Sequence, residues 1–290
     1  MKKLMLIILC AAAVAAAYGC GDGNGARGGD TSMDGILRSL REDGMNSWWD
    51  VLAVYSAGHN PMDYPGFDEI LYALEDAAST LDKAAYVIVS SVAIAIGADY
   101  EYFEEYENFR AALRGLLESP GEAGLHEYII ACLALKSSGA EFDAEPVLEH
   151  FRAEMLAADG GFALEDDFIT ALALPMLALM DYAGSGGGPL LSAAASALIS
   201  RIGELGDAST TALAISALLS YSRDEAALAQ AQGSLGLFAS GGGFSFTQGG
   251  ERNDIPTAHG LIALGDLSGG TNVWLKLYSE MLAAWEFFGY

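Results

Sequence analysis

The sequence predicts an all-α domain that closes into an (α/α)6 toroid of six inner and six outer helices. Alanine-rich apolar segments recur at intervals of 38 to 47 residues and alternate with charged amphipathic segments. No stretch alternates polar and apolar residues between turn signals, as a half-buried strand would. Apolar residues make up 52 % of the 290-residue chain, which is enough for a sizeable core.

The first 19 residues have the layout of a bacterial lipoprotein signal peptide. Lys2 and Lys3 precede an apolar run from Leu4 to Ala17, which at 14 residues is shorter than the ~20 needed to span a membrane. The Ala-Tyr-Gly-Cys sequence that follows resembles a lipobox, in which the cysteine, here Cys20, becomes lipidated. We therefore expect an extracytoplasmic protein that is lipid-anchored to the bacterial cell membrane. The alternative is ordinary cleavage after Ala17 and free secretion.

Residues 20–35 are rich in glycine and polar residues and lack an apolar period, so they are expected to form a flexible tether. The toroid domain is then expected over residues 36–290. Cys10 lies in the signal segment, and Cys132 is the single cysteine of the domain. Because Cys132 stands in the apolar stretch IIACLAL, it is interpreted as a small core residue rather than a nucleophile.

The charge balance narrows the classes of partner. The chain carries 39 acidic and 14 basic residues, for a formal net charge of −25. Nucleic acids and anionic lipid headgroups both require positive protein surface. We therefore expect no nucleic acid partner, and contact with the membrane only through the N-terminal lipid.

Twelve helical segments follow the tether in strict alternation. Those that are apolar or small on most sides are predicted to be inner helices, and they end at Gly58, Gly97, Gly139, Gly184, Ser222 and Gly269. Those with a single apolar stripe are predicted to be outer helices, over residues 67–78, 100–118, 144–157, 189–204, 224–238 and 271–287. Six pairs favour a closed ring, with an open solenoid of helical hairpins as the alternative.

Two loops between an outer and an inner helix share a motif. Gly-Gly-Phe ending at Phe162 is followed by Asp167 and Thr-Ala, and Gly-Gly-Phe ending at Phe244 is followed by Asp254 and Thr-Ala. This pattern resembles the repeat of the terpenoid cyclase and protein prenyltransferase toroid superfamily, which also includes transcobalamin-like proteins and complement-type thioester domains. The resemblance implies a ligand-binding mouth at the end of the toroid where these loops emerge.

At such a mouth we expect aromatic side chains with a few polar partners. The candidates are Trp48, Tyr64, Phe162, Phe244 and Phe246, with Asp167, Asp254 and His259. They would suit a small apolar or cationic ligand. Each candidate also has a structural interpretation: the two acids could cap helices, the two motif phenylalanines could fill gaps between hairpins, and His259 could be a hydrogen-bonded buried residue.

The enzymes of the superfamily need motifs that this sequence lacks or only approximates. The acid motif of squalene-type cyclases, Asp-x-Asp-Asp-Thr-Ala, is interrupted here between Asp167 and Thr170. The Asp-x-Cys zinc pair and the Gly-Cys-Gly-Glu-Gln thioester sequence do not occur, so no metal is expected. We therefore predict a binding domain without catalysis or cofactor. Cobalamin or another corrinoid is the cofactor alternative, and a cyclase-like or glycan-active enzyme and a scaffold for a cell-surface protein are the functional alternatives.

Overall fold

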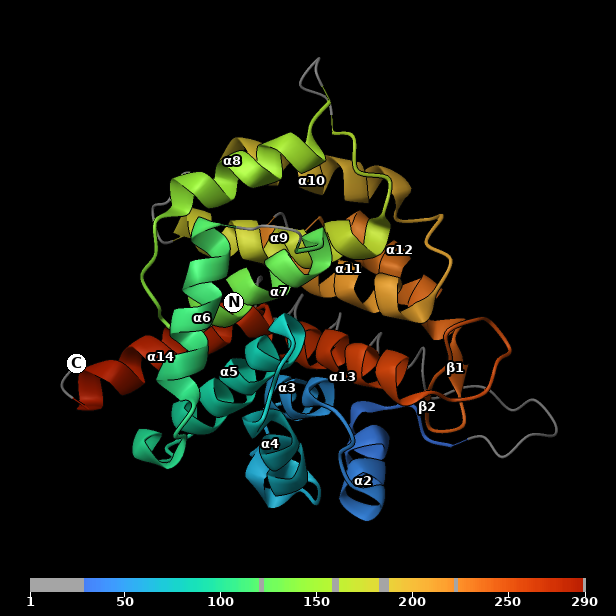
Figure 1. Ribbon diagram of the computed structural model, residues 1–290. Helices are drawn as coiled ribbons and strands as arrows, with labels where there is room; N and C mark the ends of the chain where they lie inside the picture. The colour runs from blue at the N-terminus through green and yellow to red at the C-terminus, as the bar shows by residue number, and fades with distance from the viewer. Residues whose placement is uncertain (1–28, 120–122, 158–161, 183–187, 222–223, 289–290) are drawn as a thin grey trace, which may run out of the picture.

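The computed structural model describes residues 29–119, 123–157, 162–182, 188–221 and 224–288. The predicted signal peptide, Cys20 and most of the predicted tether lie outside the described residues. The described part is mostly helical, as predicted, and its one sheet is a short hairpin of β1 (Ala239–Ser240) and β2 (Gly243–Phe244) (Figure 1). None of its helices is both long and apolar enough to cross a bilayer.

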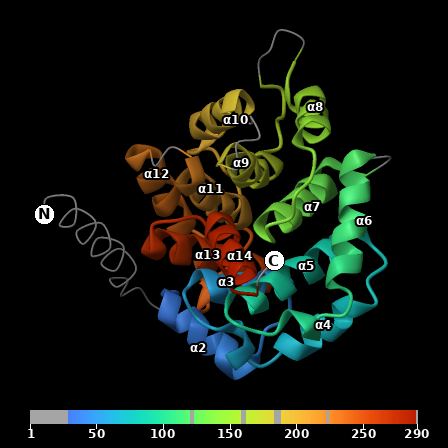
Figure 2. The ribbon, with the colours of Figure 1, turned by 90° about the vertical axis from the view of Figure 1, so that its left-hand side faces the viewer.

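Six helices form the centre of the molecule, and nearly all of their middle residues are buried because their sequences are apolar or small on every side. Each packs against the next in chain order, and the last packs against the first, so their contacts form a closed cycle (Figure 2). These helices are α3 (Trp48–Ser56), α5 (Thr80–Ala95), α7 (Leu125–Ser137), α9 (Asp167–Tyr182), α11 (Ala208–Tyr221) and α13 (Asp254–Gly269).

Amphipathic helices lie around this cycle (Figure 2). They are α4 (Phe67–Glu75), α6 (Tyr106–Glu118), α8 (Ala144–Met155), α10 (Gly188–Arg201) and α12 (Glu225–Gly236), with two short 3-10 turns, η1 (Pro61–Asp63) and η2 (Tyr100–Tyr102). In α6, for example, Phe109, Leu113 and Leu117 are buried at helical spacing while the opposite face is exposed. The alternation of inner and outer helices therefore follows the prediction through the first five pairs.

The final helix, α14 (Val273–Phe288), does not take the outer position predicted for residues 271–287. It contacts α3, α5, α7, α9 and α13, and so crosses the end of the cycle at which the inner helices finish (Figure 2). Trp274, Leu277 and Met281 are at most 1 % exposed there. Buried Asn272 donates to the Ser216 carbonyl at 2.8 Å, which directs the chain across this end instead of along the flank.

Helix α2 (Met33–Asp43) packs against α13, in the place left by the missing sixth outer helix. Ser32 caps α2 by accepting from the Gly35 amide at 3.2 Å, and Ile36, Leu37 and Leu40 are buried. The ordered helix therefore begins three residues earlier than the predicted domain boundary at residue 36. A cap followed by an apolar stripe outweighs the Gly-rich composition that precedes it.

A polar cluster fixes α14 to the ends of the inner helices. Asp266 of α13 is 2 % exposed and accepts hydrogen bonds from Ser56 of α3, at 2.8 Å, and from Ser216 of α11. Lys276 of α14 donates to the Tyr55 carbonyl at 2.8 Å. These bonds join α14 to the inner helices by groups that satisfy one another.

Candidate functional site

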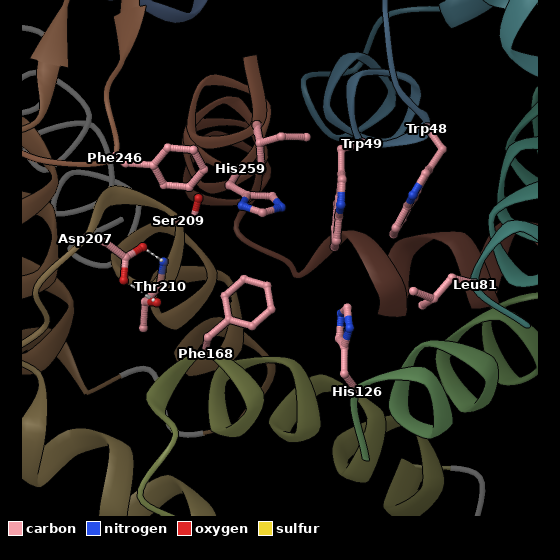
Figure 3. Close-up of a pocket in the computed structure, with 11 residues that line it drawn as sticks. Trp48, Trp49, Leu81, His126, Phe168, Asp207, Ser209, Thr210, Phe246 and His259 are labelled. Atoms are coloured by element: carbon pink, nitrogen blue, oxygen red, sulfur yellow. Dashed lines mark hydrogen bonds between the residues drawn. The ribbon is translucent and has the colours of Figure 1, made fainter. Parts of the chain in front are cut away.

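A pocket of about 460 Å³ lies at the opposite end of the inner helices, where all six begin. We call this pocket the mouth. It is lined by Trp48, Trp49, Leu81, His126, Phe168, Asp207, Ser209, Thr210, Phe246, Ile255 and His259 (Figure 3). Its size is within the range of small-molecule sites, roughly 300–1,000 Å³.

The second residue of every inner helix lines the mouth. These six residues are Trp49, Leu81, His126, Phe168, Ser209 and Ile255. The six helices begin at the same end of the cycle, so side chains at equivalent positions converge on its centre. None of these six was among the site residues predicted from the sequence, which in the lining included Trp48, Phe246 and His259. Reading the second position of all six predicted inner helices would have found the others.

Short polar side chains hold five of the six helix starts. Ser47, Ser79, Asp166, Asp207 and Asn253 each accept a hydrogen bond from a backbone N–H in the first turn of the helix that follows, at 2.8–3.3 Å. Such caps satisfy N–H groups that have no partner within the helix. They fix the first turns, and with them the side chains that line the mouth.

His259 is the most unusual residue of the mouth. Its side chain is 1 % exposed, yet neither ring nitrogen has a hydrogen-bond partner among the described residues. Burial lowers the pKa of His259 to about 3, because the charged imidazolium would lose its hydration. The ring is therefore neutral at physiological pH and presents one N–H donor and one nitrogen acceptor.

Aromatic rings surround His259. Trp49 meets it edge to face at a centroid distance of 4.4 Å, and Phe168 lies at 6.2 Å. Trp48 stacks on Trp49 at 3.9 Å, and His126 lies 5.8 Å from Phe168. In Figure 3 these rings come from four different helices and face one common space. The wall is thus largely aromatic, with sparse polar groups.

Two further polar residues lie on the α11 side of the mouth. The Ser209 hydroxyl is buried and, like His259, has no hydrogen-bond partner among the described residues. Asp207 accepts from the Thr210 amide at 2.8 Å and from the Thr210 hydroxyl at 2.7 Å. A carboxylate has about four acceptor positions, so Asp207 keeps capacity for a further donor.

Three of the predicted site residues line the mouth: Trp48, Phe246 and His259. Phe246 is 43 % exposed, and its carbonyl accepts from the Ala208 amide at 3.3 Å. The loop between β2 and α13 is thereby held against the start of α11. This contact places the Phe246 ring beside the pocket.

The other three aromatic candidates do not line the mouth. Tyr64 is buried beneath the Arg41 guanidinium, which lies 5.0 Å from the ring centroid. Phe162 forms an isolated bridge with Leu156 in the loop after α8. Phe244 is fully buried against α13, where a Cβ on Gly260 would come within 2.3 Å of its ring. All three are placed as packing residues, because each fills space between elements.

The two acidic candidates also lie outside the pocket lining. Asp167 forms an ion pair with Arg201, and Asp254 is exposed at the first position of α13. Neither caps its helix, because the preceding residues Asp166 and Asn253 accept the first-turn N–H groups instead. The carboxylates that approximate a cyclase motif are therefore occupied by a helix cap and an ion pair.

A second hollow, of about 450 Å³, lies at the α14 end and is lined mainly by apolar residues with Asp99 and Glu280. Glu280 already accepts from the Tyr55 hydroxyl at 2.6 Å, and none of the described lining residues has an unpaired buried polar atom. The mouth differs in having two such residues. Unpaired buried polar atoms also occur away from any pocket, at Tyr86, Ser90 and His150, so it is their position in a pocket wall that makes the mouth the candidate site.

Within the described ranges, no group of side chains is placed for metal or thiol chemistry. No three His, Cys, Asp or Glu side chains are placed there to hold a metal ion. Cys132 is buried in α7, and burial raises the pKa of its thiol above the ordinary value. A thiol with a raised pKa is a poor nucleophile. No family model, curated protein or solved structure matches the chain.

Proposed function

We propose that this protein binds a small, largely apolar molecule at the mouth of an (α/α)6 toroid, without catalysing its conversion. The closed cycle of contacts among the six inner helices supports the toroid. So does the repeated use of the second helical residue at one end of the cycle. The resemblance to the terpenoid cyclase and prenyltransferase superfamily remains part of this proposal.

The single observation that carries the binding proposal is His259. Leaving a buried polar group unpaired costs about 1–3 kcal/mol for each donor or acceptor. His259 lies in the pocket wall with both nitrogens unpaired, between the rings of Trp49 and Phe168. A ligand that supplies an acceptor or a donor to this imidazole removes the cost, and the aromatic wall buries its apolar part.

Two features favour binding over catalysis. Asp166 and Asp167, the acids nearest to a cyclase motif, are engaged in a helix cap and in an ion pair with Arg201. A proton donor of that kind needs a carboxyl group with a raised pKa that faces the substrate. Asp207, the carboxylate in the lining, is already engaged by two hydrogen bonds from Thr210 at the start of α11.

The proposed location is the outer face of the bacterial membrane, with a lipid on Cys20. Gly29 lies directly against the turn between β1 and β2, and a Cβ on Gly29 would come within 2.3 Å of the Gly242 nitrogen. The chain therefore reaches the domain beside the hairpin of β1 and β2 (Figure 1), and the loop after β2 carries Phe246 of the mouth. The nine residues from Cys20 to Gly29 span at most about 30 Å, so a lipid on Cys20 would hold the mouth close to the membrane.

The binding proposal is tested by native mass spectrometry of the full chain purified from its own source, followed by solvent extraction. We expect a bound small molecule, and we expect Phe246→Ala to lower its occupancy about five- to tenfold, since a large ring at the pocket edge is lost. Tyr221→Ala is the matched control, because Tyr221 is equally exposed, at 43 %, but lies at the far end of α11. Bare protein, or equal loss in both variants, would contradict the proposal.

The anchor is tested separately by growth with radiolabelled palmitate. We expect the label on the wild-type chain and none on Cys20→Ser, because only this cysteine occupies the lipobox position. Cys132→Ser is the control and should keep the label. An unlabelled wild-type chain in the culture medium would instead support cleavage and secretion.

A further inference from the structure

The starts of the six inner helices carry an excess of negative charge. Each has an acidic residue at its cap or in its first turn: Asp50, Asp82, Glu127, Asp167, Asp207 and Asp254. Each helix N-terminus contributes roughly half a positive charge. Arg201 neutralises Asp167, so the other five carboxylates outweigh the six helix dipoles by roughly two charges.

The lining of the mouth holds no compensating cation. None of its described residues is Lys or Arg, and the imidazole of His259 is neutral. Burial raises the pKa of Asp50, and the nearby charge of Asp254 adds a smaller effect in the same direction, against the hydrogen bonds that Asp50 accepts from Asn46 and Ser47. An anionic headgroup would therefore meet no counter-charge in this pocket.

The polar atoms that do face the pocket are suited to accept hydrogen bonds. The neutral His259 ring offers one unpaired nitrogen, the Ser209 hydroxyl is unpaired, and Asp207 has unused acceptor positions. Both His259 and Ser209 are more than nine-tenths buried. Three acceptors around one space match the three N–H donors of an ammonium group.

We infer that the mouth recognises a protonated amine carried on an apolar group, with the ammonium directed at His259, Ser209 and Asp207. This inference rests on the proposed binding function and names the class of its ligand. The rings of Trp49 and Phe168 flank the same space, and aromatic faces attract cations within about 6 Å.

The remaining lining suits the apolar part of such an amine. Leu81, Ile255, Trp48 and Phe246 lie around the rim and offer no charge. The net charge of −25 also attracts cations over longer distances, and that attraction weakens as salt is added. The inference therefore requires both selectivity for the charged form of a ligand and dependence on ionic strength.

The test compares two probes of nearly equal shape, 2-phenylethylammonium and 2-phenylethanol. Each is titrated into the full chain in detergent, and tryptophan emission is followed, since Trp48 and Trp49 line the pocket. At low ionic strength we expect the ammonium to bind at least about tenfold more tightly than the alcohol. Raising the ionic strength should narrow this preference.

Two variants test whether Asp207 is responsible for the preference for the ammonium over the alcohol. Asp207→Asn keeps the capping oxygen but removes the charge, and it should reduce the preference for the ammonium about fivefold or more. Asp143→Asn makes the same change at the cap of α8, where Asp143 accepts from Glu145 at 3.1 Å, and should leave the preference unchanged.

Equal or tighter binding of the alcohol, or no binding of the ammonium, overturns the amine inference. The binding function then stands if the alcohol binds and His259→Phe removes that binding, or if the extracted protein yields another ligand. If neither probe binds and the extracted protein is bare, both the inference and the proposed function fail.

Discussion

The two ends of helix α13 treat buried polar groups in opposite ways. Near its end, Asp266 is 2 % exposed and receives hydrogen bonds from Ser56, Ser216 and the Val273 amide. Near its start, His259 is 1 % exposed and receives none from the described residues. Both residues lie on the same helix and are buried to nearly the same degree. The difference between them therefore arises from the elements that cover each end of the helix.

At the Asp266 end, α14 crosses the inner helices and completes the polar network. At the His259 end no helix does so, and the polar atoms border a pocket of about 460 Å³. Buried polar groups that are hydrogen-bonded help to specify a single fold. Buried polar groups without a partner cost free energy, and such a cost is typically retained at functional sites. The comparison therefore supports a structural role for Asp266 and the proposed binding role for His259.

Removing Asp266 tests the structural half of this comparison and has the largest expected effect. Asp266→Ala removes the acceptor of the Ser216 hydroxyl and of one backbone N–H, and one of the two acceptors of the Ser56 hydroxyl, and should lower the free energy of unfolding by about 3–5 kcal/mol. Urea unfolding followed by circular dichroism measures it. Glu286→Ala, an exposed change on the neighbouring helix α14, should stay within about 0.5 kcal/mol. Similar stability of the two variants would remove the structural role.

Phe244 and Phe246 give a second contrast, close to the mouth. Phe244 is fully buried against Gly260, so Phe244→Ala should cost about 3–4 kcal/mol of stability. Phe246 is 43 % exposed, so Phe246→Ala should cost less than about 1 kcal/mol while weakening ligand binding. Thermal unfolding and ligand occupancy, measured on both variants, separate the roles. A destabilised Phe246→Ala with normal occupancy would reverse the assignment.

The pH dependence of stability should have opposite signs for Asp266 and His259. Burial raises the Asp266 pKa to about 7 from 3.8, against the opposing effects of its hydrogen bonds and Lys276. The folded protein therefore holds a proton that the unfolded chain releases between these values. This contribution to stability is complete below about pH 4 and is lost as the pH rises toward 7.

For His259 the folded pKa is lowered to about 3 from 6.5, so its contribution is complete above about pH 6.5 and is lost as the pH falls. Between pH 4.5 and 6.5, Asp266→Asn should gain stability relative to wild type as the pH rises. His259→Phe should lose stability relative to wild type over the same range. Each change should amount to roughly 1–3 kcal/mol in urea unfolding. If the stability of both variants relative to wild type changed with pH in the same direction, the opposite pKa shifts of Asp266 and His259 would be contradicted.

The inner helices could be predicted because their residues are apolar or small on nearly every face, a pattern that only burial explains. The position of α14 could not. Its apolar stripe, which includes Trp274 and Leu277, has the same spacing whether it packs along the flank or across the end. The position of α14 is decided by the bonds from Asn272, just before the helix, to Ser216, and these bonds depend on tertiary contacts.

A pocket lies at the end of the inner helices where the sequence predicts a mouth, but only three of its lining residues were among the predicted site residues. The sequence alone does not distinguish the aromatic residues of these loops from one another. Phe162 and Phe244 were therefore predicted as site residues together with Phe246. What distinguishes Phe244 is the space above Gly260, which exists only when β2 packs on α13. The sequence does contain a positional signal for the lining, because the second residue of each inner helix faces the centre.

The most direct test of the central claim is nitrogen-15 NMR of the His259 imidazole in the full chain, from neutral pH to pH 4.5. The account predicts a neutral ring throughout, because its pKa is near 3, and a shift of one ring nitrogen when 2-phenylethylammonium is added. If instead the ring becomes charged near pH 6.5 and its nitrogens do not respond to any bound ligand, His259 is not a buried residue that awaits a hydrogen-bond partner in a binding pocket.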